Sequence, residues 1–333
     1  MRVAVIGATG VVGETILRVL EERNVPVDVL LAYASRERDN AVAFRGVSLP
    51  VAVATTARII ADRPDVAFFA SSDDASADMA QALADAGIVV IDNSSTFRLD
   101  PDCPLVVPEV NPQAIKANHK IFPVGNCTAI VLCVALGPIE HAFGLKDVRV
   151  ATYQAVSGAG RAGLDALAAE EAGANPNGTF AAPILHNVVP QIGSFSGIGS
   201  SGEEEKVAQE TRKTLNRPDL HVAATCVRVP VRRAHSEAVF FETEETTSVE
   251  EIGDVLANAP GLVFHDRGIV TPLDVENSDL VHVARLRSED KEDGTLFQMW
   301  VVGDQLRKGA ATNGVQILEL LVEQGRFDAV SAG

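Results

Sequence analysis

The chain has 333 residues, of which 47% are hydrophobic, and it carries a formal net charge of −17. This length suits two domains, the apolar fraction is typical of a globular protein, and the acidity excludes nucleic acid as an expected partner, because binding it requires a cationic face. No apolar run approaches the roughly 20 residues that cross a bilayer, and the N-terminal apolar run is too short for a signal peptide, so we expect a cytoplasmic protein with no membrane partner.

The first part of the chain alternates predicted strands with predicted helices. Residues 2–6 predict a short buried strand, and a helical pattern with Ile16, Val19 and Leu20 on one face then runs to about residue 23. Further buried strands are predicted at residues 27–34, 66–70 and 88–91, with a helix at about 75–86. This β-α-β alternation predicts an α/β fold with a Rossmann-type, doubly wound parallel sheet.

The pattern changes after about Gly125. A helix is predicted over residues 128–136, and strand-like runs follow at residues 148–156, 222–231, 236–243, 281–286 and 296–302. Because strands outnumber helices here, we expect an α+β domain with a mixed, largely antiparallel sheet. The predicted domains are residues 1–126, completed by a C-terminal helical segment within 306–333, and residues 127–305.

Glycines separate the first predicted strand from the first predicted helix. Gly7, Gly10 and Gly13 are spaced G-x-x-G-x-x-G, a variant of the commoner G-x-G-x-x-G. Glycine lets the backbone approach a ligand closely, and the start of the following helix binds a pyrophosphate. The strand before and the helix after the motif favour a dinucleotide site over a plain tight turn.

The residues after the second predicted strand distinguish NAD from NADP. An acidic residue at this place holds the ribose of NAD, whereas arginine accommodates the 2′-phosphate of NADP. This chain has Ser35, Arg36 and Arg38 there. The pattern therefore predicts NADP as the cofactor, the alternative being two surface arginines in a loop.

Cys127 is the candidate nucleophile. It lies in the sequence Gly-Asn-Cys-Thr directly before an apolar helical pattern, and a helix N-terminus stabilises a thiolate and offers N–H groups to an oxyanion. Cys133 falls inside that helical pattern and is interpreted as core, and Cys103 and Cys226 have no comparable setting. No C-x-x-C pair is present, so we expect neither a metal site nor a disulfide framework.

His235 is the candidate acid–base, because a thiol nucleophile in hydride chemistry needs a nearby base. Among the seven histidines, it stands beside Arg232 and Arg233 at the start of a strand-like run. The other six lie in less suggestive surroundings, where a surface or structural role is the default interpretation.

Six ordered motifs resemble the aspartate-semialdehyde dehydrogenase family. They are GATGVVG at residues 7–13, NSSTFR at 93–98, VPEVN at 107–111, GNCT at 125–128, YQAVSGAG at 153–160, and RVPV at 228–231 followed by the histidine at 235. The resemblance continues through GDQ at 303–305 and NGVQI at 313–317. It implies NADPH-dependent conversion of 4-phospho-L-aspartate to L-aspartate 4-semialdehyde through a cysteine thioester, on the route to lysine, threonine, methionine and isoleucine, by a homodimer or homotetramer.

The resemblance also implies roles for individual residues. Cys127 resembles the acylated nucleophile and His235 the acid–base, with Gln154 orienting the substrate or the base and the backbone around Asn126 holding the oxyanion. The implied substrate ligands are Arg98 and Lys206 for phosphate, Arg228 for the α-carboxylate and Glu203 for the α-ammonium. The implied cofactor-binding residues are Gly7, Thr9, Gly10, Val11, Val12, Gly13, Ser35, Arg36, Arg38, Ser71, Ser157, Gly158 and Asn313.

The chain departs from the family pattern at two places. Residues 71–74 read Ser-Ser-Asp-Asp where the family has a glycine-rich stretch, and residues 199–202 lack the family's aromatic and lysine character. An acidic pair beside a nicotinamide cofactor is unexpected. Two alternatives are N-acetyl-glutamyl-phosphate reductase, whose acylated substrate has no need of Glu203, and a non-catalytic NADP-binding paralogue, which would lack the thiol or the base.

Overall fold

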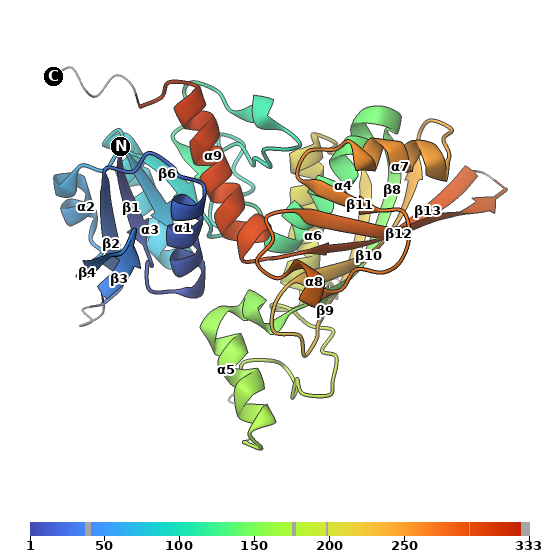
Figure 1. Cartoon of the computed structure of the whole chain (residues 1–333), viewed down its shortest axis with the longest axis horizontal. Coiled ribbons are helices and arrows are strands. Elements are labelled where there is room, and N and C mark those ends of the chain that lie inside the picture. The colour runs from blue at the N-terminus through green and yellow to red at the C-terminus, as the bar shows by residue number, and fades with distance from the viewer. Residues whose placement is uncertain (37–40, 175–177, 198, 293, 328–333) are drawn as a thin grey trace. The chain divides into compact units, whose positions relative to one another are not determined.

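A computed structural model describes residues 1–36, 41–174, 178–197, 199–292 and 294–327 (Figure 1). The chain divides into two compact units, the first formed by Met1–Gly125 with Ala310–Gly333 and the second by Asn126–Gly309. From the sequence alone we placed these boundaries at 126/127 and 305/306.

The first unit is built on a sheet that has seven strands within the described residues, in the order β3-β4-β2-β1-β5-β6-β7. All neighbours are parallel except the edge pair β3 and β4. The strands are β1 (Arg2–Ile6), β2 (Val29–Ala34), β3 (Ala41–Phe44), β4 (Val47–Val53), β5 (Val66–Phe69), β6 (Val89–Asp92) and β7 (Ile121–Pro123). The Rossmann-type prediction is confirmed, although the β3–β4 hairpin was not predicted, because Pro50 interrupts its strand pattern.

Helices cover both faces of this sheet. On one face, α2 (Thr56–Asp62) and α3 (Asp73–Asp85) share a buried core with strand residues such as Ile6 and Phe69. On the other, α1 (Val11–Glu22) packs with α9 (Thr312–Glu323), whose Gly314 lies close to Phe68. A short 3₁₀ helix, η1 (Pro112–Ala114), precedes β7. Helix α9, from the C-terminal part of the chain, therefore belongs to the first unit.

The second unit contains a sheet that has six strands in the described residues, in the order β11-β12-β13-β10-β8-β9. The outer pairs β11–β12 and β8–β9 are parallel, and the three inner pairings are antiparallel. The strands are β8 (Leu145–Gln154), β9 (His221–Arg228), β10 (His235–Thr243), β11 (Leu262–His265), β12 (Val281–Lys291) and β13 (Gly294–Gly303). The predicted mixed, largely antiparallel sheet is confirmed.

One face of this second sheet is covered by α4 (Cys127–Phe143), α6 (Gly202–Leu215) and α7 (Val249–Ala257) (Figure 1). The helix predicted to end at residue 136 continues through Gly137 and Pro138, because α4 is buried along most of its length and its packing outweighs the hydrogen bond that proline cannot donate. The unit also contains η2 (Val156–Ala159), α5 (Gly160–Glu171) and α8 (Pro272–Val275), and the π-helix η3 (Arg307–Ala311) begins in it and ends in the first unit. The C-terminal helix predicted from residue 306 thus begins with a π-helical turn.

Glu237 is a buried carboxyl group in β10. Neither of its carboxylate oxygens has a hydrogen-bond partner in the described part of the chain, and burial raises the pKa of Glu237 well above its ordinary value. The folded state therefore holds this group protonated at pH values where the unfolded chain has lost the proton. Because the unfolded state then binds fewer protons, this group makes stability fall as pH rises above the unfolded pKa.

We expect Glu237→Gln to stabilise the protein at pH 8 and to change its stability little near pH 4, because glutamine stays neutral throughout. Above the pKa of Glu237 in the unfolded chain, the difference in free energy of unfolding between the variant and the wild type should grow by up to about 1.4 kcal/mol per pH unit. It should stop growing once Glu237 also ionises in the folded state. Thermal unfolding at a series of pH values measures it, with Glu276→Gln as the control at an exposed glutamate. Parallel pH profiles for Glu237→Gln and the wild type would contradict the assignment.

Candidate active site

Asn126 caps the helix that begins with Cys127. Its Oδ1 accepts hydrogen bonds from the backbone N–H groups of Thr128 and Ala129, at 3.0 and 3.1 Å. Its own backbone N–H donates to the buried carboxylate of Glu210. The cap places Cys127 in the first turn of α4, where the helix dipole favours an anionic sulfur. The N–H groups of Asn126 and Thr128 are both engaged in these bonds, so the expectation that backbone N–H groups near Asn126 to Thr128 hold the oxyanion stays a prediction.

The sulfur of Cys127 lies 3.4 Å from Nε2 of His235, so the structure brings the predicted nucleophile and acid–base together. Nδ1 of His235 accepts a hydrogen bond from the backbone N–H of Ala155 at 3.1 Å. A backbone N–H can only donate, so Nδ1 carries no proton and the neutral ring carries it on Nε2. Burial, and after it the charge of Arg228, lower the pKa of His235 well below its ordinary value. His235 is therefore a neutral donor that faces the sulfur.

Gln154 and Glu203 extend this cluster. The side-chain Nε2 of Gln154 donates to Oε1 of Glu203 at 3.0 Å and lies 3.5 Å from Nε2 of His235. The same oxygen of Glu203 accepts from Nδ2 of Asn126 at 2.9 Å. Glu203, in the first turn of α6, thus links the cap of the nucleophile to the glutamine at the end of β8.

Arg228 ends β9 beside the cluster. Its Nη1 donates to the carbonyl oxygen of Ala155 at 2.7 Å, and its guanidinium lies 5.9 Å from the ring centroid of Phe180. Burial lowers the pKa of Arg228, opposed by the charge of Glu203. A Cβ at Gly158 would lie 2.6 Å from Nη1 of Arg228, so a side chain at this position would displace the guanidinium. Gly158, Phe180 and Arg228 line one cavity, which therefore has a cationic wall.

Two further predicted substrate ligands, Lys206 and Arg98, take part in none of the contacts described so far. Lys206 lies three residues after Glu203 on α6, on the same side of that helix, and its ammonium makes no hydrogen bond or ion pair within the described residues. Arg98 belongs to the first unit, where it is buried and its Nη2 donates to the carbonyl oxygen of Asn93 at 2.9 Å.

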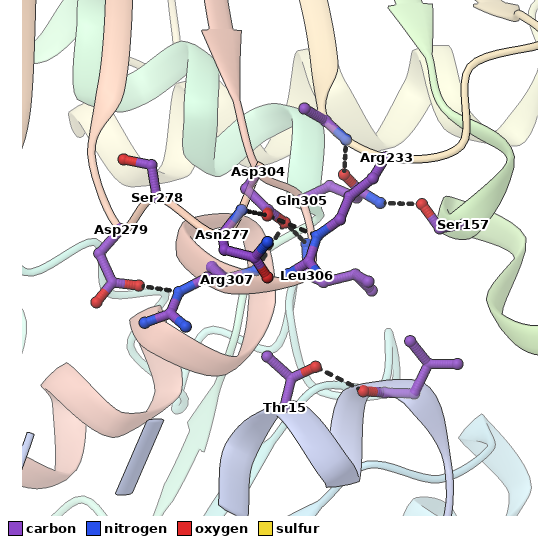
Figure 2. Close-up of polar contacts among 12 residues, drawn as sticks. Thr15, Ser157, Arg233, Asn277, Ser278, Asp279, Asp304, Gln305, Leu306 and Arg307 are labelled. Atoms are coloured by element: carbon purple, nitrogen blue, oxygen red, sulfur yellow. Dashed lines mark hydrogen bonds and ion pairs between the residues drawn. The ribbon is translucent and has the colours of Figure 1, made fainter. Parts of the chain in front are cut away.

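A polar network at the end of β13 holds the segment before His235. Ala234 has a φ of 68° and donates its N–H to Oε1 of Gln305 at 2.8 Å, while Nε2 of Gln305 donates to the hydroxyl of Ser157. Figure 2 shows Arg233 and Asn277 converging on Asp304, which accepts from Nε of Arg233 at 2.6 Å. The left-handed backbone at Ala234 is thereby fixed. Ser157, which we predicted as a cofactor ligand, contacts Gln305 here.

In the first unit, the glycine motif is required by close backbone packing. A Cβ at Gly7, whose φ is 86°, would lie 2.2 Å from the carbonyl oxygen of Ala70, and a Cβ at Gly13 would lie 2.2 Å from that of Gly7. Gly10 is the N-cap of α1, and Val11 and Val12 begin that helix.

Several of the predicted cofactor residues surround one cavity at the carboxyl ends of β1, β2 and β5. Its lining includes Gly7, Thr9, Gly10, Ser35 and Ser71. Arg36 follows Ser35 and is exposed, whereas Arg38 lies outside the described residues. Asn313 does not line this cavity, and its amide instead donates to the carbonyl oxygen of Val106 at 2.9 Å.

Both units match family models. The model "Semialdehyde dehydrogenase, NAD binding domain" matches residues 2–118, and "Semialdehyde dehydrogenase, dimerisation domain" matches residues 136–308. The aspartate-semialdehyde dehydrogenase of Aquifex aeolicus is 44% identical over 337 residues, which cover 97% of this chain and 98% of that protein. The chain belongs to the aspartate-semialdehyde dehydrogenase family.

Solved structures of this family have the same fold. Aspartate-semialdehyde dehydrogenase II from Vibrio cholerae, in complex with ASA, matches with a TM-score of 0.92 at 42% identity, covering 97% of this chain and 98% of that one. The enzyme from Candida albicans, solved with NADP, matches with a TM-score of 0.75 at 23% identity, a likeness that shows the fold alone. This aspartate-semialdehyde dehydrogenase therefore has an NAD(P)-binding domain and a dimerisation domain.

Sequence reasoning missed the residues that support the site of this aspartate-semialdehyde dehydrogenase. Glu210, Asp304 and Gln305 carry no local signal of their own, although the last two stand in the GDQ motif that contributed to the resemblance. The described residues contain no cluster of three or more side chains suited to a metal ion. Nor do they include a helix long and apolar enough to span a bilayer.

Proposed function

We propose that this family member reduces 4-phospho-L-aspartate to L-aspartate 4-semialdehyde with NADPH, through a thioester on Cys127, and runs in reverse with inorganic phosphate. The supporting observation is the sulfur of Cys127 at the start of α4, 3.4 Å from the proton-bearing nitrogen of His235. The product would serve the synthesis of lysine, threonine, methionine and isoleucine. We place the reaction in the cytoplasm, where the nucleophilic cysteine is kept reduced.

The first half of the reaction forms the thioester. The thiolate of Cys127 attacks the acyl phosphate, the S–C bond forms, the C–O bond to phosphorus breaks, and the leaving phosphate takes up one proton from solvent. In this proposal Arg98 and Lys206 bind the phosphate, because guanidinium and ammonium groups pair with it. Arg228 binds the α-carboxylate, and Glu203 the α-ammonium through its Oε2, which makes no hydrogen bond to a described residue.

The second half reduces the thioester. NADPH supplies the hydride when it is bound, and the cavity beside the β1–α1 turn, lined by Gly7, Thr9 and Gly10 at the start of a helix, suits its pyrophosphate. The oxyanion that forms on the thiohemiacetal accepts a hydrogen bond from Nε2–H of His235 and then collapses, expelling the thiolate of Cys127 and releasing the aldehyde. His235 acts in this sequence as a hydrogen-bond donor, because its other nitrogen is occupied by the N–H of Ala155.

The preference for NADP over NAD rests on the residues after β2. Ser35 lines the cofactor cavity, Arg36 follows it, and β2 (Val29–Ala34) ends without an acidic residue. An arginine at this place pairs with the 2′-phosphate. The neighbouring Arg38 enters the proposal on its sequence position alone.

We also propose that two copies pair through the face of the second sheet that α4, α6 and α7 leave uncovered. On that face Tyr153 is 39% exposed and its ring lies 5.5 Å from that of Trp300, so aromatic surface faces solvent. A second copy of the chain would bury it. Light scattering that found a monomer would contradict this pairing.

A direct assay of NADP reduction tests the activity. We expect NADP reduction when L-aspartate 4-semialdehyde and phosphate are both supplied, and little without phosphate, because phosphate must cleave the thioester. N-acetylglutamate semialdehyde is the comparison substrate, and NAD is the comparison cofactor. Preferential turnover of the acetylated aldehyde would favour the reductase alternative, and no turnover of either would favour the non-catalytic one.

A further inference from the structure

Helix α3 begins with two acidic residues beside the cofactor cavity. Asp73 and Asp74 follow Ser71, which lines that cavity, and Ser72, which caps the helix. Unpaired negative charge at this place would repel an anionic dinucleotide. The two carboxylates differ in their contacts, because Asp73 is engaged in hydrogen bonds, whereas Asp74 makes none to any described residue.

Asp73 binds the loop that follows β6. Its Oδ1 accepts from the backbone N–H of Ser95 at 2.8 Å, and its Oδ2 accepts from the hydroxyl of Ser95 at 2.7 Å. Its backbone carbonyl oxygen accepts from the hydroxyl of Thr96 at 3.1 Å. Three bonds from one residue therefore join the start of α3 to this loop.

A second carboxylate holds the same loop from inside. Asp92, the last residue of β6, is fully buried and accepts from the backbone N–H of Ser94 at 2.8 Å and from its hydroxyl at 2.7 Å. The hydroxyl of Ser76 on α3 donates to the same carboxylate. Residues 94–96 are thus held by a buried aspartate on one side and by the exposed Asp73 on the other.

The loop leads directly to Arg98. The backbone N–H of Arg98 donates to the carbonyl oxygen of Ser95 at 3.4 Å, and its guanidinium donates to the carbonyl oxygen of Asn93 at 2.9 Å. The placement of Arg98 therefore depends on Ser95, the residue that Asp73 binds.

We propose that Asp73 is a positioning residue that fixes the loop of residues 93–98 and so presets Arg98 for phosphate. This inference rests on the proposed function, in which Arg98 binds the phosphate of the substrate. A side chain held in its binding position before the ligand arrives loses less conformational freedom on binding. The acidic residue at position 73 then supports anion binding, because its carboxylate accepts hydrogen bonds from Ser95.

The test compares Asp73→Ala with Asp74→Ala, which removes the same charge from the next residue. In the phosphate-dependent oxidation of L-aspartate 4-semialdehyde, we expect Asp73→Ala to raise KM for phosphate about tenfold, the effect of losing one or two hydrogen bonds to a charged group. KM for NADP should change much less, and Asp74→Ala should leave both constants near the wild-type values. Asp73→Asn should recover much of the loss, because its Oδ1 can still accept from Ser95 and its amide can donate to the Ser95 hydroxyl.

Other outcomes overturn the inference. Equal effects of Asp73→Ala and Asp74→Ala on KM for phosphate would show that Asp73 acts through its charge alone. A change confined to KM for NADP would show that Asp73 acts on cofactor binding. If thermal unfolding shows that Asp73→Ala is not folded, Ser95→Ala is the second variant, because it removes one of the same hydrogen bonds. An unchanged KM for phosphate in Ser95→Ala would refute the proposal. A wild-type protein without phosphate-dependent activity would instead refute the proposed function.

Discussion

Replacing Cys127 with serine should lower turnover by a factor on the order of 10³ or more, because the acyl carrier becomes a hydroxyl that is not ionised at neutral pH. In enzymes that use a serine nucleophile, a neighbouring histidine removes the hydroxyl proton. His235 cannot do so readily, since its Nε2 already carries a proton and its Nδ1 is bound to the N–H of Ala155.

The measurement is kcat for NADP reduction with saturating semialdehyde and phosphate, and Cys133→Ser is the matched control. Cys133 lies on the same helix and is fully buried, and burial raises the pKa of its thiol to about 12. The Cys133→Ser variant should keep its activity. In the wild type, iodoacetamide should label Cys127 and leave Cys133 unmodified. Turnover of Cys127→Ser within tenfold of the wild type would exclude the covalent route.

Replacing His235 with asparagine should lower kcat by about 10² to 10³, the usual cost of removing one hydrogen-bond donor to an oxyanion. The variant loses the Nε2–H that faces the sulfur, so iodoacetamide labelling of Cys127 at neutral pH should also become slower. His141→Asn, at an exposed histidine in the last turn of α4, should behave like the wild type.

The pH profile of the wild type gives a sharper test of His235. Burial lowers its pKa, so the ring stays neutral through the range where an ordinary histidine titrates. Protonation at lower pH would place a proton on Nδ1 against the N–H of Ala155, so activity should hold through pH 6.5 and fall only below it. A loss of activity centred near pH 6.5 that disappears in the asparagine variant would contradict this description.

The parallel sheet could be predicted because its strands are continuous apolar runs separated by helical patterns. Among the elements that were missed or cut short, the β3–β4 hairpin contains Pro50, and α4 continues through Pro138. In both, contacts with neighbouring elements outweigh a residue that locally opposes the element. Such contacts do not appear in the local pattern.

The residues of the candidate site that could be predicted are those marked by a pattern in the sequence next to them. Cys127 could be found because the start of a helix is visible in sequence, whereas His235 had only neighbouring cations to suggest it. The two meet because α4, which begins with Cys127, packs against β10, which begins with His235. Buried carboxylates such as Glu210 and Asp304 look like surface charges in a sequence, and only the fold distinguishes them.

The four cysteines differ in their access to solvent. Cys103, Cys133 and Cys226 are buried, and Cys127 is the partly exposed one. Peroxide or a disulfide reagent will therefore meet the reactive sulfur before the others, and the first product will be a sulfenic acid or mixed disulfide that a thiol reductant can reverse. Oxidative stress would then switch off this biosynthetic step by modifying a single atom, with the rest of the fold left intact.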